Sequence, residues 1–144
     1  MIDWFNHHPI MKALRTDAST NLGKLILRLG VGAVFIYHGY PKLVAPTAVM
    51  AVGFFTKIGV PAPGFFAPFV GVVELVGGIC LILGLITRFW AAGLVIDMAV
   101  AILGAKGLAK WVGIEFELTL LVSSLLLFLS GAGAYSVDSK LVKK

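Results

Sequence analysis

The chain has 144 residues, of which 59% are hydrophobic and only 13% are charged, and its mean hydropathy is +0.98. A soluble domain of this length needs more polar surface, so the composition excludes a soluble globular protein and indicates an integral membrane protein. The formal net charge of +5 is modest. We interpret it as a signature of membrane topology and predict no nucleic-acid partner.

Residues 1–20 precede the first long apolar run and predict a short interfacial helix on the cytoplasmic side. Ile10, Met11 and Leu14 can share one helix face, with basic residues opposite, which is typical of a helix that rests on a membrane surface. Because the first apolar run begins beyond residue 20, we expect a retained span and not a cleaved signal peptide.

Four apolar runs predict an all-α membrane protein built as a four-helix transmembrane bundle. A spanning helix needs about 20 residues, with a range of roughly 17–25. Lysine and arginine are more frequent beside the two termini and the second connection than in the first and third connections. The positive-inside rule therefore places both termini in the cytoplasm. The predicted spans cover residues 22–40, 65–86, 89–105 and 114–134, within a domain over 21–138 that a basic tail over 139–144 follows.

The first and second connections differ in length. The first is rich in proline and encloses residues 48–58, which include Phe54 and Phe55. We predict an amphipathic or re-entrant segment on the outer surface here. Only Thr87 and Arg88 separate the second and third apolar runs, which predicts an antiparallel hairpin.

Ionisable residues lie inside the predicted spans, where a charge in hydrocarbon costs several kcal/mol. In each span the ionisable residue shares its helix face with glycine or other small residues, which favours a single polar bundle interior. We predict that Glu74 and Asp97, near the midplane, exchange protons, and that at least one deep carboxyl is protonated near neutral pH. The ligand-binding residues predicted from the spans are Arg28, His38 and Glu117.

A structural interpretation of the same residues stays open. Arg28 could pair with Glu74, and Asp97 could bond to Ser or Thr hydroxyls. Glu115 and Glu117 could cap the fourth helix, where negative charge is favourable. Cys80 is the only cysteine, and we expect it to be a buried, inert thiol.

Three ordered sequence blocks resemble the DoxX family of small bacterial membrane proteins. They are His38-Gly-Tyr-Pro-Lys-Leu43, the block from Glu74-Leu-Val-Gly-Gly to Thr87-Arg88, and Gly131-Ala-Gly-Ala-Tyr-Ser-Val-Asp138. The resemblance implies a four-span protein of the inner membrane. The family is named after a subunit associated with quinone-linked oxidation of sulfur compounds, and its relatives are linked with oxidative or thiol stress. By motif position, the resemblance implies a set of family-equivalent polar residues, which are Arg28, His38, Lys42, Glu74, Thr87 and Arg88. On this ground we add Lys42 and Arg88 to the predicted ligand-binding residues.

Three functions are compatible with these features. The first is a redox-associated subunit that binds a quinone in the bundle against an apolar wall that includes Phe35, Phe65, Phe66 and Phe69, with electrons exchanged through a partner protein. The second is a small proton-coupled transporter, assembled as a homo-oligomer in contact with membrane lipid. The third is a scaffold or assembly factor that docks through residues 48–58. The few histidines and the single cysteine predict no haem and no iron–sulfur cluster. We assign no metal site, although His38 with carboxylates could hold a divalent ion, which leaves a metal carrier as a weaker fourth function.

Overall fold

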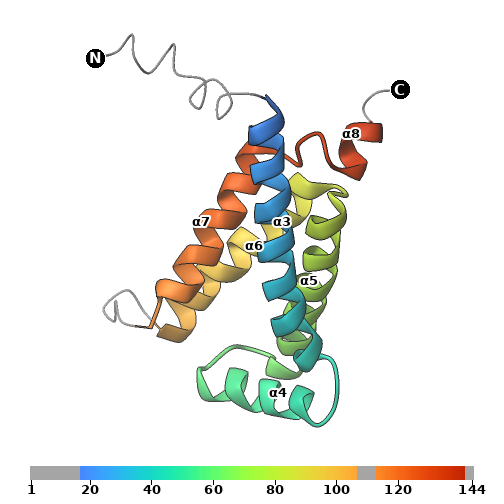
Figure 1. Ribbon diagram of the computed structural model, residues 1–144. Coiled ribbons are helices and arrows are strands. Elements are labelled where there is room, and N and C mark those ends of the chain that lie inside the picture. Colours follow the sequence, from blue (N-terminus) through green and yellow to red (C-terminus); the bar gives the residue numbers. More distant parts are fainter. Residues whose placement is uncertain (1–16, 107–112, 142–144) are drawn as a thin grey trace, which may run out of the picture.

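The computed structural model describes residues 17–106 and 113–141, and all regular elements in these ranges are helical. Its long helices lie side by side, and the described parts of both chain ends are at the same end of the bundle (Figure 1). The long helices are α3 (Asp17–Gly39), α5 (Pro63–Leu83), α6 (Thr87–Val100) with its π-helical continuation η2 (Ala101–Lys106), and α7 (Glu115–Ser130).

Three of the helical segments are long and apolar enough to cross a membrane. They are Asp17–Lys42 with 26 residues, Pro63–Leu83 with 21 and Thr87–Gly104 with 18. Large apolar side chains on their outer faces are exposed, among them Ile26 and Ile96, as expected of surfaces that contact lipid. The predicted all-helical membrane protein is thus confirmed, whereas α7, with 16 residues, is shorter than the usual length of about 17–25.

The packing of α3 on α5 depends on glycines that lie on the faces predicted for them. A Cβ atom built at Gly32 would lie 2.6 Å from the Gly78 carbonyl oxygen, and one at Gly39 would lie 2.5 Å from the Leu75 nitrogen. Only glycine therefore lets these two helices come so close. At Gly104 on η2, in contrast, an added Cβ atom would have no described neighbour within 4 Å. The part of the core that α6 and α7 form contains larger side chains, such as Leu94 of α6 and Leu127 of α7.

The turn between α5 and α6 comes earlier than predicted. α5 ends at Leu83, and Thr87 and Arg88 form the first turn of α6 instead of the connection. Gly84 and Ile86 adopt left-handed conformations, with φ of 67° and 47°, and reverse the chain within three residues. Asp138 closes this turn because its carboxylate accepts hydrogen bonds from the backbone nitrogens of Ile86 and Thr87, at 2.7 and 2.9 Å.

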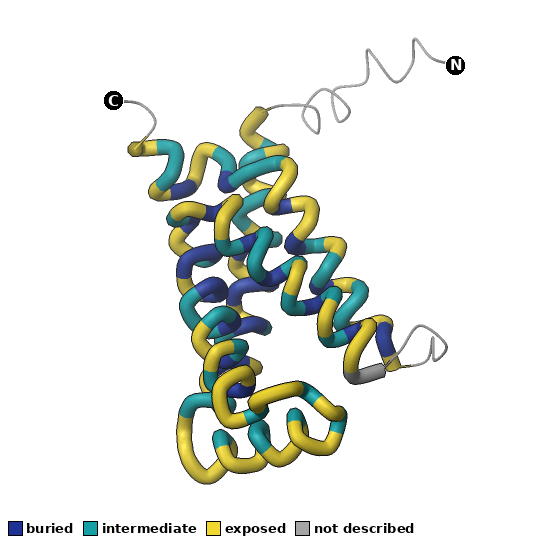
Figure 2. The backbone as a smooth tube through the Cα atoms, turned by 180° about the vertical axis from the view of Figure 1, so that it is seen from behind, coloured by how far each residue is buried: buried dark blue, intermediate teal, exposed yellow. Residues whose placement is uncertain are grey.

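The predicted segment in the first connection is a helix, α4 (Thr47–Lys57), joined to α3 through the 3-10 turn η1 (Tyr40–Lys42). α4 lies across the end of the bundle that is opposite the termini (Figure 1). None of its residues is fully buried, as the yellow and teal tube in Figure 2 shows. At the other end, the short helix α8 (Val137–Leu141) follows α7. The predicted interfacial helix over residues 1–20 falls mostly outside the described residues.

Candidate functional site

An open cavity of about 860 Å³ lies between α4 and the neighbouring ends of the long helices. Its wall is mainly apolar, with aromatic and methionine side chains contributed by α3, α4, α5, α6 and α7. Five of the seven predicted site residues converge on it, and two of them, Lys42 and Glu74, form the pair described below. The lining includes Phe35, His38, Lys42, Met50, Phe54, Phe55, Phe66, Glu74, Asp97, Met98, Phe116 and Glu117.

Lys42 and Glu74 form an ion pair at the base of this cavity. The Glu74 side chain is only 5% exposed, and the Lys42 ammonium also donates to the His38 carbonyl oxygen at 3.1 Å. Gly71 makes room for this arrangement, because a Cβ atom there would lie 2.8 Å from the Lys42 Cβ atom. The partner of Glu74 is therefore Lys42, and not Arg28 as in the structural interpretation of the sequence.

Asp97 projects from α6 towards the same pair. Its carboxyl is close enough to Glu74 and Lys42 to interact with both. The Oδ2 atom is buried and has no hydrogen-bond partner among the described residues. A buried acceptor without a donor is unusual in a folded protein.

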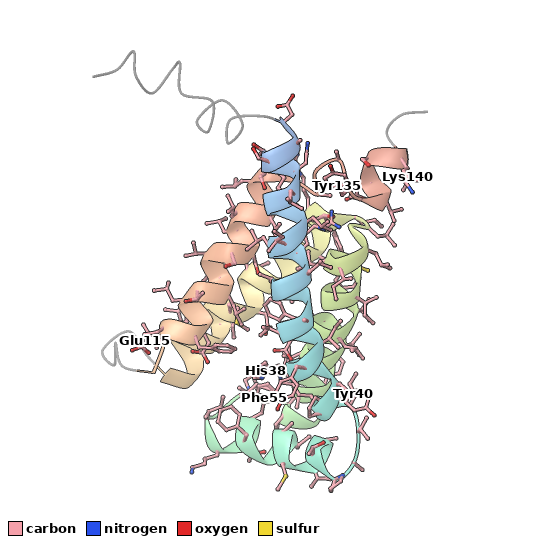
Figure 3. All side chains as sticks on the ribbon, viewed as in Figure 1. His38, Tyr40, Phe55, Glu115, Tyr135 and Lys140 are labelled. Atoms are coloured by element: carbon pink, nitrogen blue, oxygen red, sulfur yellow. The ribbon has the colours of Figure 1, made fainter. Side chains whose placement is uncertain are left out.

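His38 and Glu117 complete the polar part of the lining. The His38 ring lies 5.3 Å from the Phe116 ring, measured between centroids, and Figure 3 shows His38 beside Phe55, where the end of α3 meets α4. Glu117 belongs to the first turn of α7. Glu115 lies in the same turn, where its negative charge is favourable, and its carboxylate accepts a hydrogen bond from the Gly113 nitrogen at 2.5 Å, before the helix begins.

Arg28 lies at the other end of the bundle and does not reach the cavity. Its guanidinium is buried and donates to the carbonyl oxygens of Leu81 at 2.9 Å, Ala132 at 2.6 Å, Ile82 at 3.0 Å and Tyr135 at 2.9 Å. These contacts join the last turn of α5 to the segment after α7. Tyr135 is labelled at this end in Figure 3, far from His38.

Arg88, the other predicted ligand-binding arginine, also lies at the end with the chain termini. It is exposed and donates to the Leu129 carbonyl oxygen at 3.3 Å. The structure thus brings together His38, Lys42, Glu74, Asp97 and Glu117, and separates both arginines from them. Among the residues that the structure describes, no group of three or more His, Cys, Asp or Glu side chains is arranged to hold a metal ion.

Comparisons with known proteins agree with this architecture. The DoxX family model matches residues 23–107. The chain belongs to the DoxX family. The match covers α3, α4, α5, α6 and η2, and therefore most of the cavity lining. No solved structure gives a significant match.

Several relatives resemble the chain over most of their length. The "Uncharacterized membrane protein Rv3486" of Mycobacterium tuberculosis is 37% identical, over 83% of this chain and 82% of the relative. The "Putative oxidoreductase CatD" of Bacillus subtilis is 32% identical, over 85% and 89%. The "Inner membrane protein YqjF" of Escherichia coli is also 32% identical, over 86% and 95%. The DoxX chain described here is accordingly a membrane protein.

The sequence predicted the residues of the apolar wall only in part. Phe35 and Phe66 line the cavity as predicted, whereas Phe65 and Phe69 are 63% and 50% exposed and lie outside its lining. Phe55, on α4, was assigned to a docking surface and instead lines the cavity. The apolar positions of this helix were visible in the sequence, but the direction in which they face depends on how α4 folds back over the bundle.

Proposed function

We propose that this DoxX-family protein binds a flat lipophilic ring compound, most simply a quinone, as the membrane subunit of an oxidoreductase system. The observation that carries the proposal is the convergence of Lys42, Glu74, Asp97 and His38 on one aromatic-lined cavity. Ligand sites are typically apolar cavities of about 300–1,000 Å³ with a few convergent polar groups. The name of the relative CatD, which contains the word oxidoreductase, supports a role in an oxidoreductase system.

The lining suits a ring with two polar edges. Phenylalanine side chains from α4, α5 and α7 present flat apolar faces to a ring. The Lys42 ammonium has three donors, of which the structure uses one for Glu74 and one for the His38 carbonyl oxygen. A third donor is left for a ligand oxygen. Glu74 and Asp97, which interact closely, are placed to hold one proton between them, because two neighbouring carboxylates with a single ammonium leave a surplus of negative charge.

In this proposal α7 is the fourth span, matched by a locally thinner bilayer, as short apolar helices can be. Both termini are cytoplasmic, so α4 lies at the outer interface and the cavity opens towards the outer leaflet. Electrons pass between the bound ring and a redox partner protein, because a chain with one cysteine and three histidines offers few ligands for a redox centre of its own.

The test is to purify the protein in mild detergent and identify the lipophilic molecules that it retains by mass spectrometry. We expect near-stoichiometric quinone in the wild-type protein and a loss of at least tenfold in the Glu74→Gln, Asp97→Asn double variant. Asp17→Asn is the matched control, since Asp17 is an exposed carboxylate at the start of α3, far from the cavity. Ordinary phospholipid alone in the wild-type protein would contradict the proposal.

A proton-coupled transporter is the second candidate, and the buried Glu74–Asp97 pair favours it. Transport requires a route to the opposite end of the bundle, where Arg28 of α3 donates to four backbone carbonyl oxygens, two in α5 and two in the segment after α7. Substrate uptake by vesicles that follows an imposed proton gradient, without retained quinone, would favour transport over ligand binding.

A further inference from the structure

We propose that the ligand of the cavity is a ring with a long apolar chain, and that this chain leaves the cavity sideways, between α4 and η2, into the surrounding lipid. The inference rests on the proposed function and adds the chain-bearing class of the ligand and the passage that its chain occupies. It concerns binding and entry, and not the chemistry of the ring.

The first step is the size of the cavity relative to a single ring. The cavity has a volume of about 860 Å³, whereas a cavity of about 150 Å³ is enough to hold benzene. A ring held by Lys42 at the base therefore leaves most of the volume empty. The wall around this remaining space is mainly apolar, so we expect the part of the ligand that fills it to be apolar as well.

The second step is the position of the cavity mouth. Side chains at the base are buried, as the exposed fractions of 1% for Phe35 and 6% for Met98 show. Val100 of α6 also lines the cavity but is 61% exposed. It lies one helical turn after Ile96, whose exposed side chain belongs to the lipid-facing surface of α6. The cavity therefore reaches this lipid-facing surface beside Val100.

The third step is the opposite side of the mouth, which α4 forms. Met50 and Phe54 of α4 line the cavity and are 71% and 55% exposed, so they lie at its edge. α4 packs mainly against α5 and η1, and its side towards η2 borders the cavity. The lining residues of η2, Ala101 and Gly104, are small, and a Cβ atom added at Gly104 would have no described neighbour within 4 Å. This side of the cavity is therefore the open one.

The fourth step is the chemistry of the rim. Apart from His38, the exposed side chains of the described lining are apolar. An exposed apolar surface of this kind indicates contact with lipid or with an apolar ligand. A chain that starts in the cavity and continues into the bilayer satisfies both. The large exposed side chains of the lining are Met50, Phe54, Phe66, Val100 and Phe116.

The experiment is photo-crosslinking to the full-length protein in lipid nanodiscs. The first probe is a benzoquinone with a decyl chain that carries a diazirine at its free end, and the second is a benzoquinone without a chain that carries the diazirine on the ring. Labelled residues are mapped by peptide mass spectrometry, with and without an excess of unlabelled decylbenzoquinone. Only labelling that is lost on competition reports the site. Ile26, exposed on α3, reports contact with probe that is dissolved in lipid.

Two glycine variants test the passage. Gly104→Trp fills the space between α4 and η2. Gly30→Trp is the matched control, because Gly30 lies on α3 and a Cβ atom there also has no described neighbour within 4 Å. For each variant, decylbenzoquinone and the chainless tetramethylbenzoquinone compete against the ring-labelling probe.

We expect competed labelling by the chain-end probe at Met50, Phe54 or Val100, and none at Ile26. Gly104→Trp should weaken competition by decylbenzoquinone at least about fivefold, a factor typical of overpacking at one position. Competition by tetramethylbenzoquinone should be unchanged, and Gly30→Trp should change neither.

Competed chain-end labelling elsewhere on the protein, or an equal effect of Gly104→Trp on both competitors, would overturn the inference but leave the proposed function intact. If neither probe gives competed labelling of the wild-type protein, both the inference and the proposed function are wrong. If Gly104→Trp does not fold, the positions labelled in the wild-type protein decide the question.

Discussion

Replacing Arg28 by glutamine should destabilise the bundle strongly while leaving the cavity able to bind its ligand. The Arg28 side chain is 1% exposed and makes four hydrogen bonds, to Leu81, Ile82, Ala132 and Tyr135. Leu81 and Ile82 lie in the last turn of α5, whose carbonyls lack partners within the helix. The other two carbonyls follow α7, so this one side chain joins three parts of the chain.

The size of the effect follows from the number of bonds lost. Hydrogen bonds between helices in membranes contribute about 0.6 kcal/mol on average, and those to charged groups in proteins about 1.5 kcal/mol or more. Loss of most of the four bonds should therefore lower the free energy of unfolding by roughly 2–5 kcal/mol. Arg28→Lys should recover only part of it, since an ammonium cannot reproduce the planar geometry of the guanidinium.

The measurement is reversible unfolding in mixed micelles with increasing dodecyl sulfate, followed by tryptophan fluorescence. Arg88→Gln is the matched control, because Arg88 is exposed at the same end of the bundle and makes one bond of 3.3 Å. We expect Arg88→Gln to lower the free energy of unfolding by less than about 1 kcal/mol. If Arg28→Gln lowers the free energy of unfolding by no more than Arg88→Gln does, the four hydrogen bonds of Arg28 do not stabilise the bundle as argued. Loss of ligand binding in a folded Arg28→Gln protein would show instead that Arg28 acts on the ligand, as the sequence suggested.

Three further predictions concern packing, the α6 turn and the ion pair. Gly78→Ala should destabilise the protein by about 1–3 kcal/mol in the same assay, because the new methyl group would meet the α3 backbone, whereas Gly30→Ala, with open space around it, should be close to neutral. Asp138→Ala should cost about 1 kcal/mol and speed hydrogen exchange of the two amides that Asp138 caps; unchanged exchange would contradict this role. Lys42→Met should destabilise more than the double change Lys42→Met, Glu74→Gln, because the single change leaves a buried carboxylate without its cation. Equal stability of the two variants would show that the pair is not coupled.

Several features of the fold could be predicted from local sequence. The apolar runs predicted helices that match α3, α5 and α6 closely, because a run of about 20 apolar residues usually forms a membrane-spanning helix. The glycine-rich faces around Glu74 and Arg28 correctly indicated where α3 and α5 pack. The turn after α5 was placed too late, since the left-handed conformation of Ile86 is rare for a β-branched residue and leaves no sign in the sequence.

The candidate site was predicted less completely. The deep positions of Glu74 and Asp97 marked them as unusual, and the structure places both on the cavity. The sequence did not show that Lys42 pairs with Glu74, because the two residues are far apart in the chain and lie on different elements. Arg28 was grouped with the ligand-binding residues by its helix face and Arg88 by its place in the family motif. The structure places both outside the cavity lining, towards the end of the bundle that carries the chain termini.

The sequence by itself determined that the chain is a helical membrane protein with a polar interior, because the cost of exposing backbone or charge to lipid leaves few alternatives. Only the tertiary structure decided which charges meet. α4 folds back across the end of the bundle (Figure 1), so that Phe55 and Lys42 enclose a cavity with Asp97, and the residues after α7 return to the Arg28 guanidinium. Such long-range contacts depend on the directions of turns and the close approach of glycines in three dimensions, which local composition does not encode.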